Sequence, residues 1–280
     1  MTLPLASIQA LVIDMDGVLW RGTQPLPGVA EFFEFLSQNS IGFLLATNNA
    51  TRTPDYAVDR MAALGVAVPV RQVLTSASAA ALWLQHELPA GAHVMIVGET
   101  GLYETLSRAG FQTIDPGDPA TVGQRADAVV AGLDRAFTYD KLRRAMFEIR
   151  AGARFIATNG DATLPAEDGL LPGAGSVVAA IQTASGVVPV TIGKPYRPMF
   201  DAALDVLQTP RERTAMLGDR LDTDIEGGRQ AGLASILVLT GVTTAEEAQA
   251  SPIKADFTFS NLIELRRQWA GELARANVAS

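Results

Sequence analysis

Short apolar runs alternate along this chain with longer amphipathic stretches, and this alternation constrains the fold more than any other feature. The runs that read as buried strands cover residues 11–13, 42–46, 94–97, 128–131, 155–157, 215–217 and 236–239. Stretches with helical spacing cover residues 29–37, 56–64, 78–88, 139–151, 176–184, 198–207 and 224–231. Strands that alternate with helices are typical of parallel sheets covered on both faces, so we predict an α/β fold.

The length of the chain favours two domains. Its 280 residues approach the size of about 250–300 residues at which a single core stops growing. The middle segment, residues 82–187, has an alternation of its own, so we predict that it is a smaller α/β unit inserted into the first. Residues 1–81 and 188–280 then form a Rossmann-like core with a doubly wound parallel sheet, and hinges are expected near 75–78 and 185–193.

Composition excludes several classes of protein. Apolar residues make up 48% and charged residues 19%, which excludes disorder as the main state. The net charge of −8 argues against binding to a nucleic-acid polymer. No cysteine is present, and His86 and His93 are too few for a three-histidine metal site. Neither a spanning apolar run nor an N-terminal signal is visible, so we expect a cytoplasmic protein without a membrane partner.

A pair of carboxylates follows the first predicted strand. Asp14 and Asp16 stand one residue apart directly after residues 11–13, and Gly17 allows a tight turn behind them. One carboxylate can act as a nucleophile and metal ligand, and the other as a general acid/base. The alternative is an ordinary turn.

A second polar cluster, Thr47-Asn48-Asn49, follows the strand predicted at 42–46. A hydroxyl and backbone N–H groups at the start of a helix can bind phosphate. The alternative is a helix N-cap with no ligand.

A lysine stands between a glycine and a proline after the apolar residues 187–192. In Gly193-Lys194-Pro195 the lysine can neutralise a phosphate together with an attacking carboxylate. The segment lacks the glycine-rich run of a Walker A loop, and an ordinary surface lysine is the alternative.

A fourth cluster, rich in acidic residues, follows the strand predicted at 215–217. It contains Asp219, Asp222 and Asp224, and carboxylates gathered at a strand end indicate a site for a hard cation such as Mg²⁺. Helix capping is the alternative for Asp224 and its neighbour Thr223. Together the four clusters supply what phosphoryl transfer needs, namely a nucleophile, an acid/base, a phosphate cradle, a cation and metal ligands.

The order of these motifs resembles the haloacid dehalogenase superfamily, and within it the branch of 4-nitrophenyl phosphatases, phosphoglycolate phosphatases and NagD-like phosphatases. The resemblance extends over about residues 8–242 and includes the segments 14–20, 155–161, 172–175 and 218–225. It implies that residues 82–187 form a cap domain.

The resemblance also implies roles for individual residues. Asp14 would be the nucleophile that forms an aspartyl-phosphate, and Asp16 would protonate the leaving alcohol and then activate water. Lys194 would hold Asp14 and the phosphate.

The remaining motif residues would bind phosphate and metal. Thr47, Asn48 and Asn49 would contact the phosphoryl group. Mg²⁺ would be bound by Asp14, by the backbone carbonyl of Asp16 and by Asp219, while Asp224 would orient Lys194 or metal-bound water.

Weaker features concern specificity and packing. Asn159 and Asp161 lie in a predicted cap loop, and Arg52 or Arg135 could meet an anionic substrate. Trp20 is expected to be a packing residue. A solvated helix start accounts for Glu246 and Glu247, and the tail with Arg266, Arg267 and Arg275 is expected to be a solvated helix.

The predicted function is Mg²⁺-dependent hydrolysis of a small phosphorylated metabolite, because a large cap would exclude bulky phosphoproteins. Sugar phosphates, phosphoglycolate, 4-nitrophenyl phosphate and nucleotides all stay open as substrates. The alternatives are a phosphotransferase or mutase on the same fold, a receiver-like phosphoacceptor domain and an inactive binding protein. Relatives can dimerise through the cap, so a homodimer is one expectation.

Overall fold

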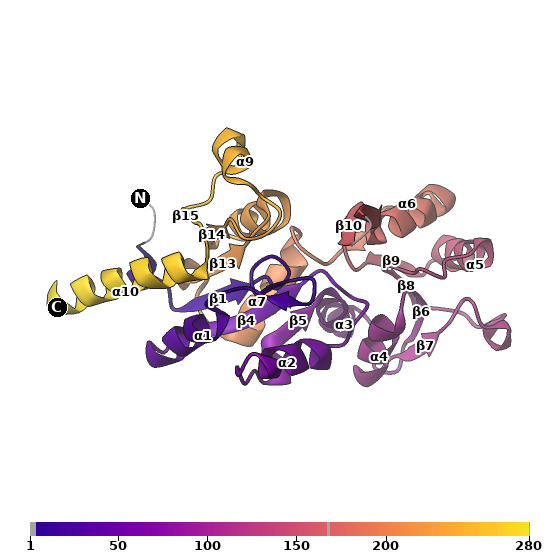
Figure 1. The fold of residues 1–280 in the computed structure, drawn as a ribbon. Coiled ribbons are helices and arrows are strands. Elements are labelled where there is room, and N and C mark those ends of the chain that lie inside the picture. Colours follow the sequence, from indigo (N-terminus) through magenta and orange to yellow (C-terminus); the bar gives the residue numbers. More distant parts are fainter. Residues whose placement is uncertain (1–3, 167–168, 280) are drawn as a thin grey trace. The chain divides into compact units, whose positions relative to one another are not determined.

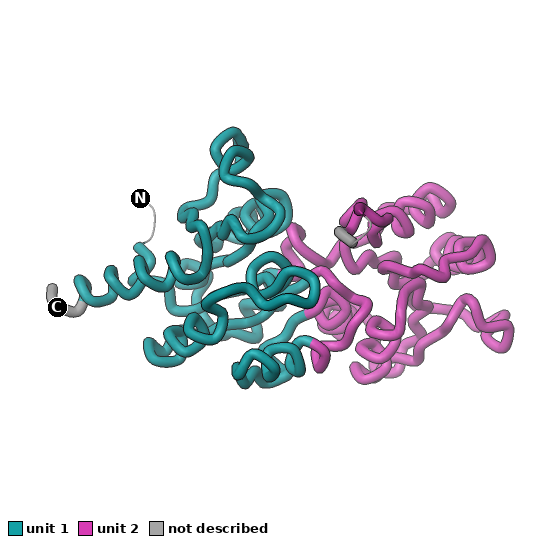
Figure 2. Tube along the Cα trace, viewed as in Figure 1, with its two compact units in different colours: residues 1–47, 57–74, 200–280 teal, residues 48–56, 75–199 magenta. Residues whose placement is uncertain are grey.

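A computed structural model describes residues 4–166 and 169–279 of the chain, and these residues form two compact units (Figure 2). Unit 1 comprises residues 1–47, 57–74 and 200–280. Unit 2 comprises residues 48–56 and 75–199. The segment that the sequence predicts to be inserted, 82–187, lies within unit 2.

Unit 1 is built on a six-stranded sheet in the order β15-β14-β13-β1-β4-β5 (Figure 1). Its strands are β1 (Ala10–Ile13), β4 (Gly42–Thr47), β5 (Val73–Thr75), β13 (Thr214–Gly218), β14 (Ala234–Val238) and β15 (Phe257–Phe259). The central strand β1 is buried along its whole length and pairs in parallel with β13 and with β4. A strand buried on both faces is apolar at every position, which is why β1 reads as a continuous run. A short hairpin of β2 (Trp20–Arg21) and β3 (Gln24–Pro25) follows β1.

The helices of unit 1 are α1 (Val29–Gln38), α2 (Pro54–Ala63), α7 (Arg197–Leu207), α8 (Glu226–Gln230), α9 (Ala245–Ala250) and α10 (Leu262–Ala279), and the first residues of α2 and α7 belong to unit 2. Most helices of unit 1 bury residues in its core, whereas α9 buries none. Short helical turns lie at η1 (Leu5–Ser7), η2 (Val70–Gln72), η4 (Arg211–Arg213) and η5 (Leu221–Ile225). The α1 and α10 helices meet where Phe35 and Trp269 stack edge to face, with ring centroids 5.8 Å apart.

Unit 2 has a parallel five-stranded sheet of its own in the order β12-β9-β8-β6-β7. Its strands are β6 (His93–Val97), β7 (Gln112–Ile114), β8 (Ala128–Ala131), β9 (Arg154–Ala157) and β12 (Val190–Thr191). Its helices are α3 (Ser76–Glu87), α4 (Thr100–Arg108), α5 (Tyr139–Arg150) and α6 (Ala174–Ser185), with the turn η3 (Pro119–Thr121) and an antiparallel hairpin of β10 (Thr163–Ala166) and β11 (Gly169–Pro172).

One face of the unit 2 sheet carries a core formed with α5 and α6. Val97 and Val129 from the strands pack with Ile149 of α5 and Ile181 of α6, and all four side chains are buried. The predicted α/β class with parallel sheets is confirmed in both units.

The predicted strands all coincide with observed strands, whereas the helix predictions need two corrections. The helix expected at 224–231 begins with the π-helical turn η5, in which the N–H of Ile225 bonds to O of Arg220. The tail forms α10 but is not simply solvated, because Leu262, Leu265 and Trp269 are fully buried.

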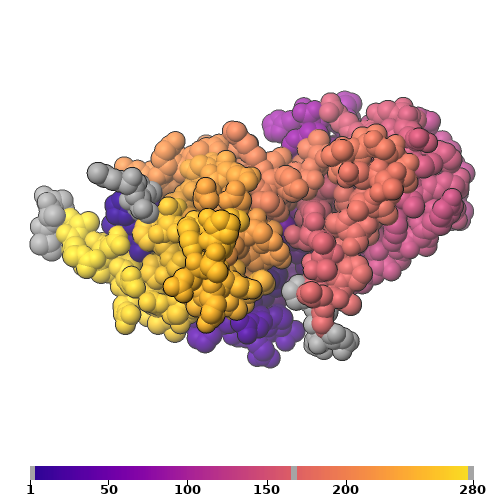
Figure 3. Space-filling view, turned by 90° about the horizontal axis from the view of Figure 1, so that it is seen from above, coloured from indigo at the N-terminus to yellow at the C-terminus, as the bar shows by residue number. Residues whose placement is uncertain are grey.

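The helix start expected at Glu246 and Glu247 is confirmed as α9. Thr244 caps it, because its hydroxyl accepts from the N–H of Glu247 and the Glu247 carboxylate accepts from the N–H of Thr244. The segment lies on the surface of unit 1, where it faces the viewer in amber in Figure 3. Among the helices of the described residues, none is long and apolar enough to cross a bilayer.

Candidate active site

Two carboxylates meet at the carboxyl ends of the neighbouring strands β1 and β13. Ile13 pairs with Leu217, and the backbone N–H of Asp14 donates to O of Leu217 at 2.8 Å, so the ladder continues beyond the end of β1. Asp219 directly follows β13. Residues that follow parallel neighbouring strands leave the sheet at the same edge, which places Asp14 next to Asp219.

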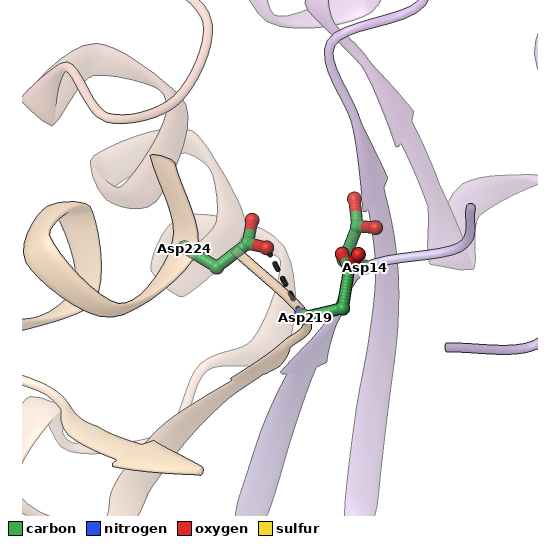
Figure 4. Close-up of side chains that lie close together, drawn as sticks. All are labelled: Asp14, Asp219 and Asp224. Atoms are coloured by element: carbon green, nitrogen blue, oxygen red, sulfur yellow. Dashed lines mark hydrogen bonds between the residues drawn. The ribbon is translucent and has the colours of Figure 1, made fainter. Parts of the chain in front are cut away.

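The side chain of Asp224 is bonded to the backbone of the turn that follows β13. Its Oδ2 accepts hydrogen bonds from the N–H groups of Asp219 (3.2 Å) and Arg220 (3.0 Å), as Figure 4 shows for Asp219. One carboxylate oxygen from each of Asp14, Asp219 and Asp224 lies within 4.8 Å of the other two. Asp224 therefore fixes the turn that carries Asp219 while adding a third carboxylate to the group.

A loop after β14 holds the Asp219 side chain from the other side. The N–H of Val242 donates to Asp219 Oδ2 at 2.6 Å, and the N–H of Thr243 donates to its backbone oxygen at 3.2 Å. Gly17 and Gly241 pack directly against the same carboxylate, and a Cβ at either position would collide with it. Glycine is required there because no side chain fits between these backbones and Asp219.

The carboxylate group has the donor chemistry of a magnesium site. Asp14 is 8% exposed, and Asp219 and Asp224 are 1% exposed. Ionised carboxylates so close together and so little hydrated repel one another, and a divalent cation relieves this repulsion. Mg²⁺ prefers oxygen ligands and commonly takes one or two carboxylates. Asp14 and Asp219 fit that requirement.

The third acid of the sequence cluster, Asp222, does not join the group. Its carboxylate accepts hydrogen bonds from Arg220 Nε (3.1 Å) and from the Arg220 NH2 group (2.8 Å), and its side chain is mostly exposed. These hydrogen bonds from the Arg220 guanidinium lower the pKa of Asp222 below its ordinary value. Asp222 is therefore a surface ion-pair residue.

Two further predicted residues of unit 1 lie near the same sheet edge. Thr47 is the last residue of β4, which pairs with β1 on the side opposite to β13, and it is 6% exposed. Asp16 is exposed, and its Oδ1 accepts a hydrogen bond from the indole Nε1 of Trp20 at 2.9 Å.

Within unit 2, Asn48 and Lys194 are joined directly although 146 residues separate them in the sequence. Asn48 Oδ1 accepts from the backbone N–H of Lys194 at 2.8 Å, and Asn48 Nδ2 donates to its backbone oxygen at 2.9 Å. The same Nδ2 donates to Asp161 Oδ2 at 3.1 Å. Both amide hydrogens of Asn48 are therefore used inside unit 2.

The neighbours of Asn48 complete this arrangement. Its backbone oxygen accepts from Ser76 Oγ (2.6 Å) and from Asn159 Nδ2 (2.8 Å). Asn49 is exposed, and its Oδ1 accepts from the N–H and the hydroxyl of Thr51. Asn49 thus forms an Asx turn that directs the chain after the motif.

Sequence reasoning missed several residues that hold the predicted ones in place. The loop at Gly241 and Val242 could have been found, because it follows the strand predicted at 236–239 and so belongs to the same sheet edge. The bond from Trp20 to Asp16 has no such signal, because an indole donor and a packing indole look alike in a sequence.

Family models match two parts of the chain. A model described as haloacid dehalogenase-like hydrolase matches residues 11–112, and a model described as haloacid dehalogenase (HAD) hydrolase-like matches residues 191–265. The matched ranges contain Asp14, Asp16 and Thr47 in the first case and Lys194 and Asp219 in the second.

Several phosphatases are similar to this chain over nearly its whole length. An acid sugar phosphatase of Staphylococcus saprophyticus is 36% identical over 94% of this chain and 99% of its own length. A 4-nitrophenylphosphatase structure from Thermotoga maritima has a TM-score of 0.85 at 36% identity, over 94% of this chain and 98% of that one. A glycerol phosphate phosphatase structure from Mycobacterium tuberculosis, in complex with magnesium, has a TM-score of 0.83 at 38% identity, over 95% of this chain and 79% of that one.

The chain belongs to the haloacid dehalogenase superfamily of hydrolases, in its NagD-like phosphatase branch. Its activity class is accordingly that of a phosphatase for small phosphate esters.

Proposed function

We propose that this chain hydrolyses small phosphomonoesters with the help of Mg²⁺ and through an aspartyl-phosphate on Asp14. The observation that carries the proposal is the buried group of Asp14, Asp219 and Asp224 at the carboxyl ends of β1 and β13. Three carboxylates so close together and so little exposed offer the oxygen ligands that Mg²⁺ prefers, which supports a metal-dependent function.

In the first chemical step, a carboxylate oxygen of Asp14 attacks the phosphorus atom of the substrate. The bond between phosphorus and the ester oxygen breaks as the new bond forms. Asp16, which is exposed and lies two residues further on, gives a proton to the departing oxygen, so that the product leaves as a neutral alcohol.

In the second step, Asp16 accepts a proton from a water molecule as the water oxygen attacks the same phosphorus. The bond between phosphorus and Asp14 breaks, which releases inorganic phosphate and restores the Asp14 carboxylate. A covalent intermediate thus divides a difficult hydrolysis into two in-line displacements.

Electrostatic stabilisation is assigned to the remaining motif residues. Bound Mg²⁺ supplies positive charge where Asp14 and the phosphate bring negative charge together. Thr47 offers a hydroxyl to the phosphate, and Lys194 offers a second positive charge. We assign Asn48 an indirect role, because its side-chain donors are already bonded to Lys194 and Asp161.

For the substrate we propose a small phosphorylated polyol or sugar. The relatives support this choice, since they include an acid sugar phosphatase, a 4-nitrophenylphosphatase and a glycerol phosphate phosphatase. The sequence resemblance also keeps phosphoglycolate and nucleotides in the test.

The test measures phosphate release from a panel of such esters, with Mg²⁺ and with EDTA. We expect turnover with Mg²⁺ and its loss in EDTA. Asp14→Asn should lower kcat by roughly four orders of magnitude or more, because it removes the nucleophile with little change in volume. Asp222→Asn is the matched control and should keep most of the activity, because Asp222 pairs with Arg220 outside the carboxylate group.

Two results would refute the proposal. Near-normal activity in Asp14→Asn would remove the nucleophile from the mechanism. Transfer of phosphate to an added alcohol, with little free phosphate, would instead identify a phosphotransferase.

A further inference from the structure

The indole ring of Trp20 makes a specific contact that packing alone does not require. Trp20 is the first residue of β2, and its Nε1 donates to Asp16 Oδ1 at 2.9 Å. The turn between them is closed by backbone bonds, with Gly17 N–H donating to O of Trp20 at 2.7 Å and Leu19 N–H donating to O of Met15 at 2.8 Å. These bonds bring the indole back to the carboxylate that stands four residues before it.

The donor is buried and the acceptor is not. Trp20 is 3% exposed, whereas Asp16 is exposed. An exposed aspartate ordinarily samples several rotamers. The buried indole N–H of Trp20 restricts the rotamers of Asp16 through the bond to Oδ1. The other carboxylate oxygen, Oδ2, has no hydrogen-bond partner within the described part of the chain. One oxygen is thus held while the other is left to exchange a proton.

The indole is itself held by a second element. The guanidinium carbon of Arg60, from α2, lies 3.9 Å from the centre of the Trp20 ring, at stacking distance. The NH2 group of Arg60 also donates to the backbone oxygen of Gly22 at 2.8 Å, in the turn of the β2–β3 hairpin. The position of the donor therefore depends on the hairpin and on α2 together.

We propose that Trp20 is a positioning residue for Asp16, which it holds with Oδ2 ready to give a proton to the departing oxygen. The inference rests on the proposed function, in which Asp16 is the acid of the first step. Trp20 exchanges no proton with the substrate, and its contribution is the orientation of the acid. The effect of removing it should depend on how much the leaving group needs a proton.

Two substrates differ in this need. An alkoxide such as that of glycerol is a poor leaving group and requires protonation, whereas 4-nitrophenolate is a stabilised anion and departs with little help. The quantity to compare is kcat/KM, because it reports the steps up to the formation of the aspartyl-phosphate and excludes the later hydrolysis that both substrates share.

The experiment compares wild type and Trp20→Phe on glycerol phosphate and on 4-nitrophenyl phosphate. Phenylalanine keeps an aromatic ring but has no N–H. We expect kcat/KM for glycerol phosphate to fall roughly tenfold further than kcat/KM for 4-nitrophenyl phosphate, as a part of the 10²–10⁴ that a general acid contributes. An equal fall for the two substrates would show a packing role only and would overturn the inference.

Two reference variants separate this inference from the function on which it rests. Asp16→Asn should show the same preference for the aryl ester in a stronger form. If Asp16→Asn shows no preference for the aryl ester, the assignment of Asp16 as the acid in the proposed function fails. If Asp16→Asn shows this preference and Trp20→Phe does not, only the role of Trp20 fails. Trp83→Phe, in α3 of unit 2, is the matched tryptophan control and should leave the ratio of the two kcat/KM values unchanged.

A further variant keeps the test decisive if Trp20→Phe does not fold. Arg60→Met leaves Trp20 in place but removes the cation above its ring and the bond to Gly22. We expect a smaller shift of the kcat/KM ratio in the same direction. An unchanged ratio in a folded Arg60→Met protein would then overturn the proposed dependence on a clamped indole.

Discussion

The side-chain amide of Asn48 forms hydrogen bonds with both backbone groups of Lys194, its oxygen accepting from the N–H and its nitrogen donating to the C=O. This pairing imitates the bonding between two strands, although Asn48 follows β4 and Lys194 follows β12. It joins the second and third sequence motifs inside unit 2 and leaves Lys194 only 3% exposed. A buried lysine whose backbone is held in this way can present its charge at a defined point.

Asn48→Ala should therefore impair catalysis through Lys194. The substitution removes three hydrogen bonds, to the N–H and C=O of Lys194 and to Asp161. We expect a loss of about 1–3 kcal/mol in the free energy of unfolding, because polar groups are left unpaired. We expect kcat to fall by roughly 10²-fold, the cost of a misplaced catalytic group.

The measurement combines steady-state kinetics with denaturant unfolding. Asn39→Ala is the control, because it removes one amide bond at the end of α1 and should reduce stability without lowering kcat. A normal kcat in Asn48→Ala would mean that Lys194 needs no positioning by this amide.

Gly17 and Gly22 offer a second, matched comparison. Both have positive φ, +88° and +57°, so alanine costs about 1–2 kcal/mol of backbone strain at either position. A Cβ at Gly22 meets no atom within 4 Å, whereas a Cβ at Gly17 would lie 2.7 Å from Asp219 Cγ. Gly17→Ala should therefore displace the Asp219 carboxylate and lose most of the activity.

The assay measures phosphate release and melting temperature for both alanine variants. Gly22→Ala should keep normal activity at a slightly lower Tm. Equal activity losses in the two variants would show that strain in the turn, and not the contact with Asp219, is responsible.

The burial and length of a strand decide whether it can be predicted from the sequence. Interior strands such as β1 and β8 are buried at every position and were predicted, because a doubly covered parallel strand is apolar throughout. The strands β5, β7 and β15 were missed, since each has only three residues. Such short elements gain their strand geometry from neighbours rather than from a local pattern.

The site residues that directly follow strands of the sheet could be predicted from the sequence. Asp14 and Asp219 come together because β1 and β13 are parallel neighbours, which the motif order anticipates. The helix α4 was missed, and its Gly101 shows why: a Cβ there would overlap the backbone of Thr51 and Arg52. A glycine that weakens helical propensity is thus explained by a contact distant in the sequence.

Metal binding can be tested without turnover. Mg²⁺ should raise the Tm of the wild-type protein, because a ligand that binds only the native state stabilises it. Asp219→Asn should reduce this increase strongly. In EDTA the same variant should be as stable as wild type or more stable, since it removes one of three crowded negative charges and its amide oxygen can still accept from Val242.

The measurement is the Tm of the wild-type protein and of Asp219→Asn, from thermal scans with Mg²⁺ and with EDTA. A Tm increase of equal size in Asp219→Asn would exclude Asp219 as a ligand. A large loss of stability in EDTA would show that its charge is compensated within the protein.

The segment that follows Thr47-Asn48-Asn49 is tied to α4 by an ion pair whose effect should depend on pH. Arg108 contacts Asp55 at 2.5 Å, and hydrogen bonding from this guanidinium lowers the pKa of Asp55 below its ordinary value of 3.8. A lowered pKa in the folded state means that the pair stabilises the protein above the unfolded-state pKa and loses this effect as pH falls through the folded-state pKa. Both side chains are more than half exposed, so solvent screening should keep the contribution of the pair at neutral pH small. A double-mutant cycle of Asp55→Asn and Arg108→Met, measured by denaturant unfolding, should show a coupling energy at pH 7 that declines as the pH falls below 3.8 and through the lowered pKa of Asp55. The coupling energy should also shrink in high salt, because salt screens the two charges. A coupling energy that did not change over this range would show that the pair is held by packing of the two side chains and not by charge.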